Sequence, residues 1–276
     1  MISVQLTNGF GNNIFQYVAA RLLAEHHDQE WSLVPPTPDY YAITSLENLG
    51  LKCEGRHHPG ATQFNDNNYK SAYDSRFKDA DIHLSGYFED YRYYINHLDR
   101  IKSWFPKEPI TNFKDLVVHF RTGDTLIQCN NFAHKPSPER WTNVFKKFDF
   151  DRLHIVSDFP RWSHITKNEL EELKGFHNPN PGQLVKDKQQ SVDYINSCID
   201  EFARFDPVFV HGDIDNDFNY LRKFDKLVFQ HGTLGWWAGA LSNASTVGVY
   251  GPWRPWKGTK NKNLGQAPIP GWFKWS

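Results

Sequence analysis

The residues best suited to chemistry in this sequence follow an apolar run, Asp115 to Phe120, that is typical of a buried strand. His119 and Arg121 are two positions apart, so alternation along the strand sends both side chains to one face. An arginine at a strand end suits a pyrophosphate, because its planar guanidinium donates two parallel hydrogen bonds and stays charged. Asp124 can hold that guanidinium in place; a purely structural ion pair between Arg121 and Asp124 is the alternative interpretation.

A glycine-bearing turn near the start of the chain offers backbone N–H groups to an anion. It contains Gly9, Gly11, Asn12 and Asn13, and the positive end of the helix expected after it favours negative charge. The third glycine of the dinucleotide-binding fingerprint is missing, since Ile14 takes its place. A tight turn capped by asparagines is therefore the alternative to a ligand-binding loop.

A second turn of this kind contains His231, Gly232, Thr233 and Leu234, between an expected strand and a helix rich in small residues. Its backbone amides and the Thr233 hydroxyl can hold a phosphate at the positive end of that helix. The tryptophan pair that follows is interpreted mainly as core.

Two further segments carry carboxylates. Ser157 and Asp158 follow an expected strand, where the carboxylate can address a nucleoside base or a ribose hydroxyl. The run from Asp213 to Asp217 resembles the start of a calcium loop, but Phe218 stands at the glycine position and no glutamate closes it. It also contains the DxD pattern of manganese-dependent sugar transferases, yet its polar setting favours a capping or solvated turn. We therefore expect no metal and no cofactor.

Strands and helices alternate along most of the chain, which predicts an α/β fold with two mostly parallel sheets. The expected domains are residues 1–112 and 113–276, joined through a proline-bearing connector and separated by a cleft, with the tail from Gly251 packed back on the body. The expected strands are Ile2–Leu6, Trp31–Val34, Ile82–Tyr87, Asp115–Phe120, Leu153–Ser157, Pro207–His211, Lys226–Gln230 and Thr246–Tyr250. The expected helices are Ile14–His26, Tyr91–Phe105, Pro138–Phe148, Ser163–Leu173, Val192–Ala203 and Leu234–Leu241.

Composition excludes some classes of protein. The 276 residues carry 31 Lys and Arg against 32 Asp and Glu, a net charge of −1, which disfavours nucleic acid as a partner. No apolar run approaches the roughly 20 residues of a membrane span, and the amino terminus lacks a signal-peptide pattern. The three cysteines are far apart, so we expect a cytoplasmic protein without disulfides. Aromatic residues make up 16%, and aromatic faces serve both cores and sugar binding.

Five segments together resemble the bacterial-type α-1,2-fucosyltransferases and, more distantly, the α-1,6- and protein O-fucosyltransferases. The chain opens with VQLTNGFGNNIFQYVAARLLAEH, which is similar to the family's LxGGLGNQxFQYAxAxxLA. The segments that follow are HLSGYFEDYRYY for GYxQSxxYF, VVHFRTGD for HxRxGD, SDFPRW for SDDxxW, and QHGTLGWWAGALSNASTVGVYGPW for SSFSWWxAWLxxxxxxVIAPxxW. All five stand in the family's order and span nearly the whole chain.

The resemblance implies two Rossmann-like domains of the GT-B type and transfer of a sugar from a GDP-sugar to a glycan hydroxyl, with inversion and without a metal. It implies that Arg121 contacts the donor pyrophosphate, with His119 and Asp124 in the same motif. Further donor contacts would come from three segments: Gly9, Gly11, Asn12 and Asn13; Ser157 and Asp158 near the nucleoside; and His231, Gly232, Thr233 and Leu234 near the phosphates.

The sequence departs from the family pattern around the donor site. Asn8 replaces the first glycine, Asn13 replaces glutamine, Phe159 replaces the second aspartate, and Leu234-Gly235 replaces Phe-Ser. A transferase of the same build with another GDP-sugar, of rhamnose or mannose type, is therefore an alternative. A non-catalytic carbohydrate-binding protein and a nicotinamide-dependent oxidoreductase are alternatives of other classes. The acceptor glycan, the catalytic base and the oligomeric state are not written in the sequence.

Overall fold

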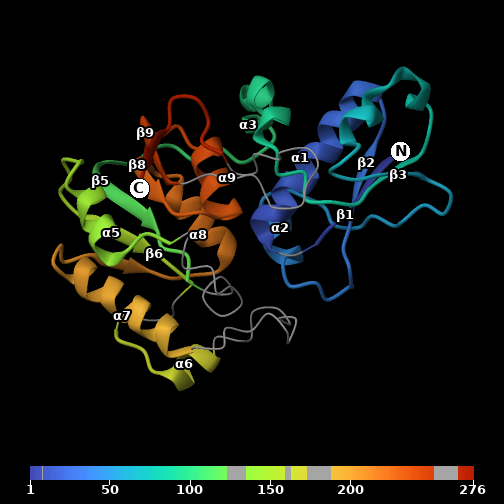
Figure 1. Cartoon of the computed structure of the whole chain (residues 1–276). Helices are drawn as coiled ribbons and strands as arrows, with labels where there is room; N and C mark the ends of the chain where they lie inside the picture. Colours follow the sequence, from blue (N-terminus) through green and yellow to red (C-terminus); the bar gives the residue numbers. More distant parts are fainter. Residues whose placement is uncertain (8, 123–134, 159–162, 173–187, 252–266) are drawn as a thin grey trace. The chain divides into compact units, whose positions relative to one another are not determined.

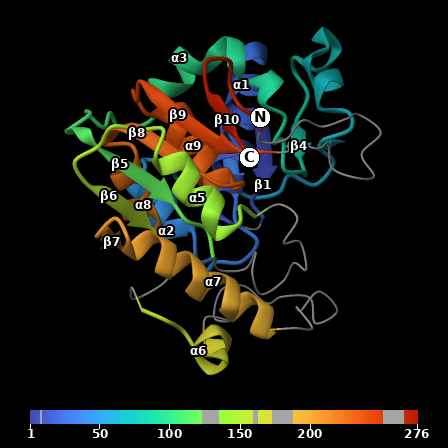
Figure 2. The same cartoon turned by 60° about the vertical axis from the view of Figure 1, so that its left-hand side comes forward.

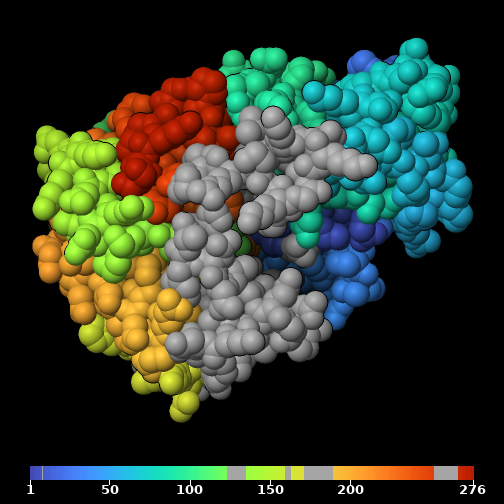
Figure 3. All heavy atoms as spheres, in the orientation of Figure 1, coloured from blue at the N-terminus to red at the C-terminus, as the bar shows by residue number. Residues whose placement is uncertain are grey.

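The computed structural model describes residues 1–7, 9–122, 135–158, 163–172, 188–251 and 267–276; the remainder is grey in Figures 1 and 3. The chain divides into two compact units. The first comprises Met1–Lys107 together with residues 267–269, and the second comprises residues 108–251 together with 270–276. Each unit is built on its own parallel sheet, as the alternation of strands and helices predicts.

The sheet of the first unit has four parallel strands in the order β2-β1-β4-β3. They are β1 (Ile2–Gln5), β2 (Trp31–Val34), β3 (Thr62–Phe64) and β4 (Ile82–Leu84). Strand β3 was not predicted, because its three residues lie in a stretch rich in turn-forming residues; its stability comes from pairing with β4. The short helix α2 (Ile43–Asn48) precedes it.

Helix α1 (Phe10–His27) follows β1 and packs on this sheet (Figure 1). It begins at Phe10, four residues earlier than expected, so that Gly11, Asn12 and Asn13 lie in its first turn with Gly9 at the N-cap. Most of its side chains are buried. The Tyr17 ring makes edge contacts with three aromatic rings from two other segments, those of Trp31 and of Trp104 and Phe105.

The continuous helix expected from Tyr91 to Phe105 is wrong. The structure has two 3-10 turns, η3 (Tyr91–Tyr93) and η4 (Ile95–His97), and then the short helix α3 (Leu98–Lys102). Tyr94 is fully buried and donates its hydroxyl hydrogen bond back to the Phe88 carbonyl, so tertiary packing shapes this segment. Two more 3-10 turns, η1 (Tyr69–Tyr73) and η2 (Ser75–Phe77), precede β4.

The sheet of the second unit has six parallel strands in the order β10-β9-β8-β5-β6-β7. They are β5 (Asn112–His119), β6 (Leu153–Val156), β7 (Val208–Val210), β8 (Phe224–Phe229), β9 (Thr246–Tyr250) and β10 (Phe273–Trp275). The helices are α5 (Pro138–Phe145), α6 (Lys167–Glu172), α7 (Lys188–Ala203), α8 (Ile214–Leu221) and α9 (Thr233–Leu241).

Helices cover both faces of this sheet. Figure 2 shows α5 and α7 across one face, where Trp141 and Phe202 form a core with alternate strand residues such as Leu116 and Val118. Helices α8 and α9 contact β8 from the other side, where Phe229 packs against Gly235 of α9. The alternation along β5 thus separates a core face from the face that carries His119.

The carboxyl-terminal part of the chain differs from the expectation of an irregular tail. Strand β10 pairs in parallel with β9, and Trp275 is buried against Tyr250 and Trp141. The tail tryptophans at 253 and 256 lie outside the described residues. Among the helices that the structure describes, none combines the length and apolar character needed to cross a membrane.

Candidate active site

His119 and Arg121 leave β5 at the carboxyl edge of the second sheet, on the face covered by α9. The prediction that both side chains share one face is confirmed by their contacts with this helix. A β-carbon on Gly235 would stand 3.0 Å from His119 Nδ1, and one on Gly232 would stand 3.1 Å from Arg121 Nη1. Phe120, between them, points into the opposite core. The edge itself is where open α/β sheets bind ligands.

Arg121 lies directly over the start of α9. Gly232 is the N-cap of this helix, no side chain supplies a capping hydrogen bond, and the Arg121 Cδ atom lies 3.2 Å from the β-carbon position of Gly232. Any side chain at 232 would displace the guanidinium. Because the first turn of a helix carries partial positive charge, α9 and Arg121 together form a surface of positive potential suited to an anion.

Gln230 fixes the backbone of Arg121. This buried side chain follows β8 and donates a hydrogen bond from Nε2 to the Arg121 carbonyl oxygen. Its Oε1 atom is buried without a hydrogen-bond partner among the described residues. Sequence reasoning did not single out Gln230, although its place between a strand and the glycine turn was a signal. The β5 and β8 ends are thus tied together beneath the guanidinium.

His119 is neutral over the whole physiological range. Burial, together with the positive charge of Arg121, lowers the pKa of its imidazole to about 3. Its Nδ1 atom is buried without a hydrogen-bond partner in the described part of the chain. A group with this pKa is a weak proton acceptor. The structure therefore favours a role in shaping the loop, by packing against Gly235, over a role as a base.

Thr122, Ser157 and Asp158 form a hydrogen-bonded group at the ends of β5 and β6. The Thr122 backbone N–H donates to Asp158 Oδ1 at 3.0 Å, and the Thr122 hydroxyl donates to the same oxygen. The Thr122 and Ser157 hydroxyls lie 3.2 Å apart, and both residues are buried. The bonds from the Thr122 N–H, the Thr122 hydroxyl and the Ser157 hydroxyl to Asp158 all use Oδ1, which fixes the orientation of the carboxylate.

Asp217 adds a carboxyl group in a run that the sequence assigned to a capping or solvated turn. Asp213 does stand at the N-cap of α8, which spans residues 214–221, but Asp215 and Asp217 are buried in its first turn, so a solvated turn is wrong for these two. Burial, together with the charges of Asp158, Asp213 and Asp215, raises the pKa of Asp217 to about 7, against the lowering effect of a hydrogen bond from the Gly212 backbone. Asp158 and Asp217 therefore belong to one electrostatic cluster.

The glycine turn of the first unit is stiffened by two amide side chains. Asn13 is fully buried; its Nδ2 donates to the Thr7 carbonyl and to Gln16 Oε1, and its Oδ1 accepts from the Tyr40 hydroxyl. Gln16 Nε2 donates to Thr7 Oγ1 and to the Gly86 carbonyl. The Asn13 amide thus uses both its nitrogen and its oxygen in hydrogen bonds within the protein, which favours a role in positioning the turn. Its predicted contact with a ligand stays a prediction.

The other predicted site residues have different surroundings. Gly11 is buried, whereas Gly9 and Asn12 are half-buried at the start of α1. Thr233 is buried in the first turn of α9, and its neighbours are half-buried at His231 and Leu234. Asp124 lies outside the described residues. Within each unit, then, the predicted residues gather at the carboxyl edge of its sheet.

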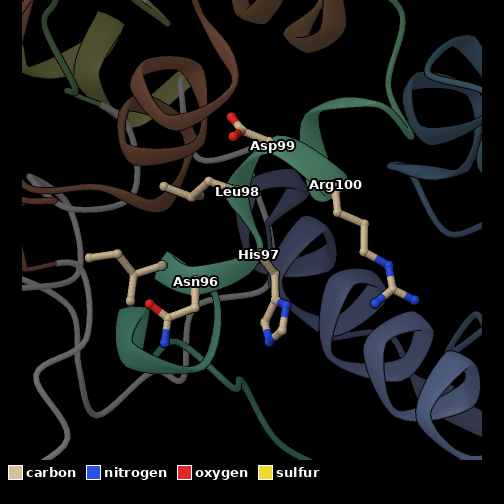
Figure 4. A pocket seen from close by; sticks show the side chains of 6 residues that line it. Asn96, His97, Leu98, Asp99 and Arg100 are labelled. Carbon is tan, nitrogen blue, oxygen red and sulfur yellow. The ribbon is translucent and has the colours of Figure 1, made fainter.

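A metal centre does not stand out in the described residues. They include no group of three or more His, Cys, Asp or Glu side chains arranged to hold a metal ion. A surface hollow in the first unit is lined by residues 95–100 (Figure 4), but the labelled side chains diverge instead of converging on one point. One of them, Arg100, forms an ion pair with Glu25 of α1.

Several solved structures match this chain, and the two described next do so at low similarity. No family model matches the chain, and no curated protein matches it. The solved structures include the dodecameric iron-containing heptosyltransferase TibC in complex with ADP-D-β-D-heptose, with a TM-score of 0.43 and 10% identity over 99% of this chain and 62% of that one. They also include the α-1,6-fucosyltransferase NodZ soaked with GDP-fucose, with a TM-score of 0.38 and 10% identity over 87% of this chain and 92% of that one. This chain thus spans less than two thirds of the TibC chain.

Proposed function

We propose that this protein is an inverting, metal-independent glycosyltransferase that moves L-fucose from GDP-β-L-fucose to a hydroxyl group of a glycan acceptor, in the manner of an α-1,2-fucosyltransferase. The observation that carries the proposal is the guanidinium of Arg121 lying against Gly232 at the positive end of α9. The five motifs that resemble fucosyltransferases support the choice of donor, and Arg121 and Gly232 both lie within them.

Arg121 can stabilise the negative charge that develops on the leaving group in this reaction. When the bond between the sugar and the diphosphate breaks, negative charge grows on the β-phosphate and positive charge grows on the sugar ring. Arg121 and the first-turn N–H groups of α9 receive the departing diphosphate without a metal ion, because both are in place before the reaction. Groups of this kind commonly supply about 3 kcal/mol each to the transition state.

The carboxyl groups of Asp158 and Asp217 lie beside this anion site and suit the nucleoside part of the donor as hydrogen-bond acceptors. Asp158 is oriented by Thr122 and Ser157 through Oδ1, so its second oxygen can accept a hydrogen bond from a ribose hydroxyl or an amino group of the base. Guanine offers such donors. The hydrogen bonds of Thr122 to Asp158 also connect the nucleoside side of the site to the strand that carries Arg121.

The surroundings of His119 and Asp90 disfavour both as the general base that takes the proton from the acceptor hydroxyl. His119 is too weakly basic, with its pKa lowered to about 3 by burial and by Arg121. The Asp90 carboxylate accepts several hydrogen bonds from Arg92 and so is already occupied. The other carboxyl groups within the five motifs include Glu89 and Asp124, which we propose as candidates for this base.

The experiment that tests the proposal combines donor binding with turnover. Calorimetric titration with GDP, UDP and ADP is expected to show binding of GDP, and GDP-fucose is expected to be consumed in the presence of EDTA. Arg121→Ala is expected to lower kcat by at least about 100-fold with the fold intact, and Arg121→Lys to lower it less, because lysine keeps the charge but not the fork.

The matched control is Arg204→Ala, which removes a surface arginine of the same unit that pairs with Glu201. It is expected to leave binding and turnover unchanged. An Arg121→Ala protein with normal turnover would refute the assignment of Arg121, and binding of UDP or ADP in preference to GDP would refute the donor. Turnover of GDP-mannose or GDP-rhamnose without GDP-fucose would identify the alternative sugar.

A further inference from the structure

Two exposed tyrosines mark the carboxyl edge of the first sheet. Among the described residues, the large hydrophobic side chains that are exposed are those of Tyr41, Tyr87, Phe113 and Val208. Tyr41 follows β2 and Tyr87 follows β4, and both of these strands are neighbours of β1. The two tyrosines therefore extend from loops on either side of the glycine turn that follows β1. Exposed aromatic rings gathered in this way are typical of a binding surface.

A shared hydrogen-bond network holds these loops in place. Gln16 of α1 bridges Thr7, in the turn after β1, and the carbonyl of Gly86, in the loop after β4. Asn13 bonds to Gln16 and to the Thr7 carbonyl, and it accepts the hydroxyl hydrogen bond of Tyr40 at 3.1 Å. The segments that carry Tyr41 and Tyr87 are thus both fastened to the first two turns of one helix.

Tyr41 is presented over the glycine turn. Its ring packs edge-to-face on Tyr40 with 4.9 Å between centroids, and Tyr40 is anchored through Asn13. The Tyr41 hydroxyl lies 3.8 Å from the position that a β-carbon on Gly9 would take. The side chain nevertheless keeps 40% of its surface exposed.

Tyr87 is held by Asp66. The backbone N–H groups of Tyr87 and Phe88 donate to the two oxygens of this carboxylate at 3.0 and 2.6 Å. A β-carbon on Gly86 would overlap Asp66 Oδ2, so only glycine fits there. Phe88 has a φ of +53°, a conformation that side-chain-bearing residues seldom adopt, and its ring is fully buried. The loop is thus locked, and Tyr87 remains 42% exposed.

We propose that Tyr41 and Tyr87 form a subsite that binds a pyranose ring of the acceptor glycan; this inference rests on the proposed transferase function. Tyrosine offers a flat apolar face and a hydroxyl at little entropic cost, which matches a sugar ring with one C–H face and a rim of hydroxyl groups. The Asp66 carboxylate that holds the Tyr87 loop favours a neutral sugar over a phosphate. The donor phosphates are assigned to Arg121, which leaves this surface to the second substrate.

The test measures sugar binding and nucleotide binding separately. Saturation-transfer NMR is recorded with the methyl pyranosides of galactose, glucose, mannose and N-acetylglucosamine, and with sorbitol, which has hydroxyl groups but no ring. At least one pyranoside is expected to receive saturation from the wild-type protein, and sorbitol is not. Tyr41→Ala and Tyr87→Ala are each expected to weaken this transfer at least about fivefold. Tyr41→Phe and Tyr87→Phe, which keep the ring, are expected to retain it.

GDP titration and a control variant separate the possible failures. Phe113→Ala removes the most exposed of these side chains, on β5 of the other unit, and is expected to change neither sugar nor GDP binding. Absence of transfer to every pyranoside, or an undiminished signal in both alanine variants, would overturn the subsite. Failure of the wild-type protein to bind GDP would instead count against the proposed function, whatever the sugar result.

Discussion

Replacing Asp217 by asparagine tests whether this carboxyl group is held in its neutral form by the fold. Asp217 is only 9% exposed, its Oδ1 atom has no hydrogen-bond partner among the described residues, and the negative charges of Asp158 and Asp215 lie nearby. Asp217→Asn removes the charge while it keeps the size and shape of the side chain. We expect this substitution to stabilise the protein at neutral and alkaline pH.

The magnitude follows from the pKa of Asp217, which burial raises from 3.8 to about 7. Below pH 3.8 the carboxyl is protonated in both states. Between pH 3.8 and about 7 the unfolded chain loses this proton and the folded protein keeps it, so the free energy of unfolding falls as pH rises. At about 1.36 kcal/mol per pKa unit, the loss has an upper limit of about 4 kcal/mol. Because a buried amide also has a desolvation cost, we expect a gain of about 1–3 kcal/mol from Asp217→Asn at pH 8.

Urea unfolding of the wild-type protein and the variant at pH 4, 6 and 8 measures this gain. The two proteins should differ little at pH 4 and most at pH 8. Asp206→Asn is the matched control, because Asp206 is exposed in the same unit and asparagine tolerates its φ of +45°. No gain at pH 8, or an equal gain at pH 4 and pH 8, would refute the reasoning.

Three further predictions concern the second unit. Gly232→Ala should weaken GDP binding at least about tenfold in a calorimetric titration while barely changing stability, because the added β-carbon would stand 3.1 Å from Arg121 Nη1. Gly248→Ala should lower the free energy of unfolding by about 1–3 kcal/mol in urea, since its β-carbon would overlap the ring of Phe273 on β10. His119→Asn should reduce the loss of stability on acidification from pH 6.5 towards 3: burial lowers the His119 pKa to about 3, so below pH 6.5 only the unfolded chain gains this proton.

The two glycine variants share one control, Gly212→Ala, whose β-carbon would make only ordinary contacts at 3.4 and 3.5 Å. If Gly232→Ala bound GDP with wild-type affinity, the position of Arg121 over the start of α9 would not be required for GDP binding. An acid-unfolding profile of His119→Asn that matches the wild type would show that this histidine is not held neutral.

Local patterns were sufficient to predict much of the second unit's site. Alternation along an apolar run placed His119 and Arg121 on one face, and their contacts with α9 confirm it. The glycine turn before a helix of small residues located the start of α9 to within one residue. These predictions succeeded because strand alternation and helix capping depend on residues close together in the sequence.

Other features depend on contacts between distant segments and were missed. Strands β3 and β10 have three residues each, too few for a recognisable pattern, and exist because β4 and β9 offer a parallel edge. The expected helix over residues 91–105 is absent where Tyr94 packs on Phe15 of α1 and Tyr93 packs on Tyr69.

The chemical properties of individual side chains also depend partly on the sequence and partly on the tertiary structure. The sequence shows which residues can ionise or donate, and the spacing that brings an arginine to a strand end. The neutral state of His119, the raised pKa of Asp217 and the use of the Asn13 amide as an internal clamp all arise from burial and from partners far along the chain. Desolvation and long-range hydrogen bonds exist only once the chain has folded, so local sequence patterns cannot predict their effects on these side chains.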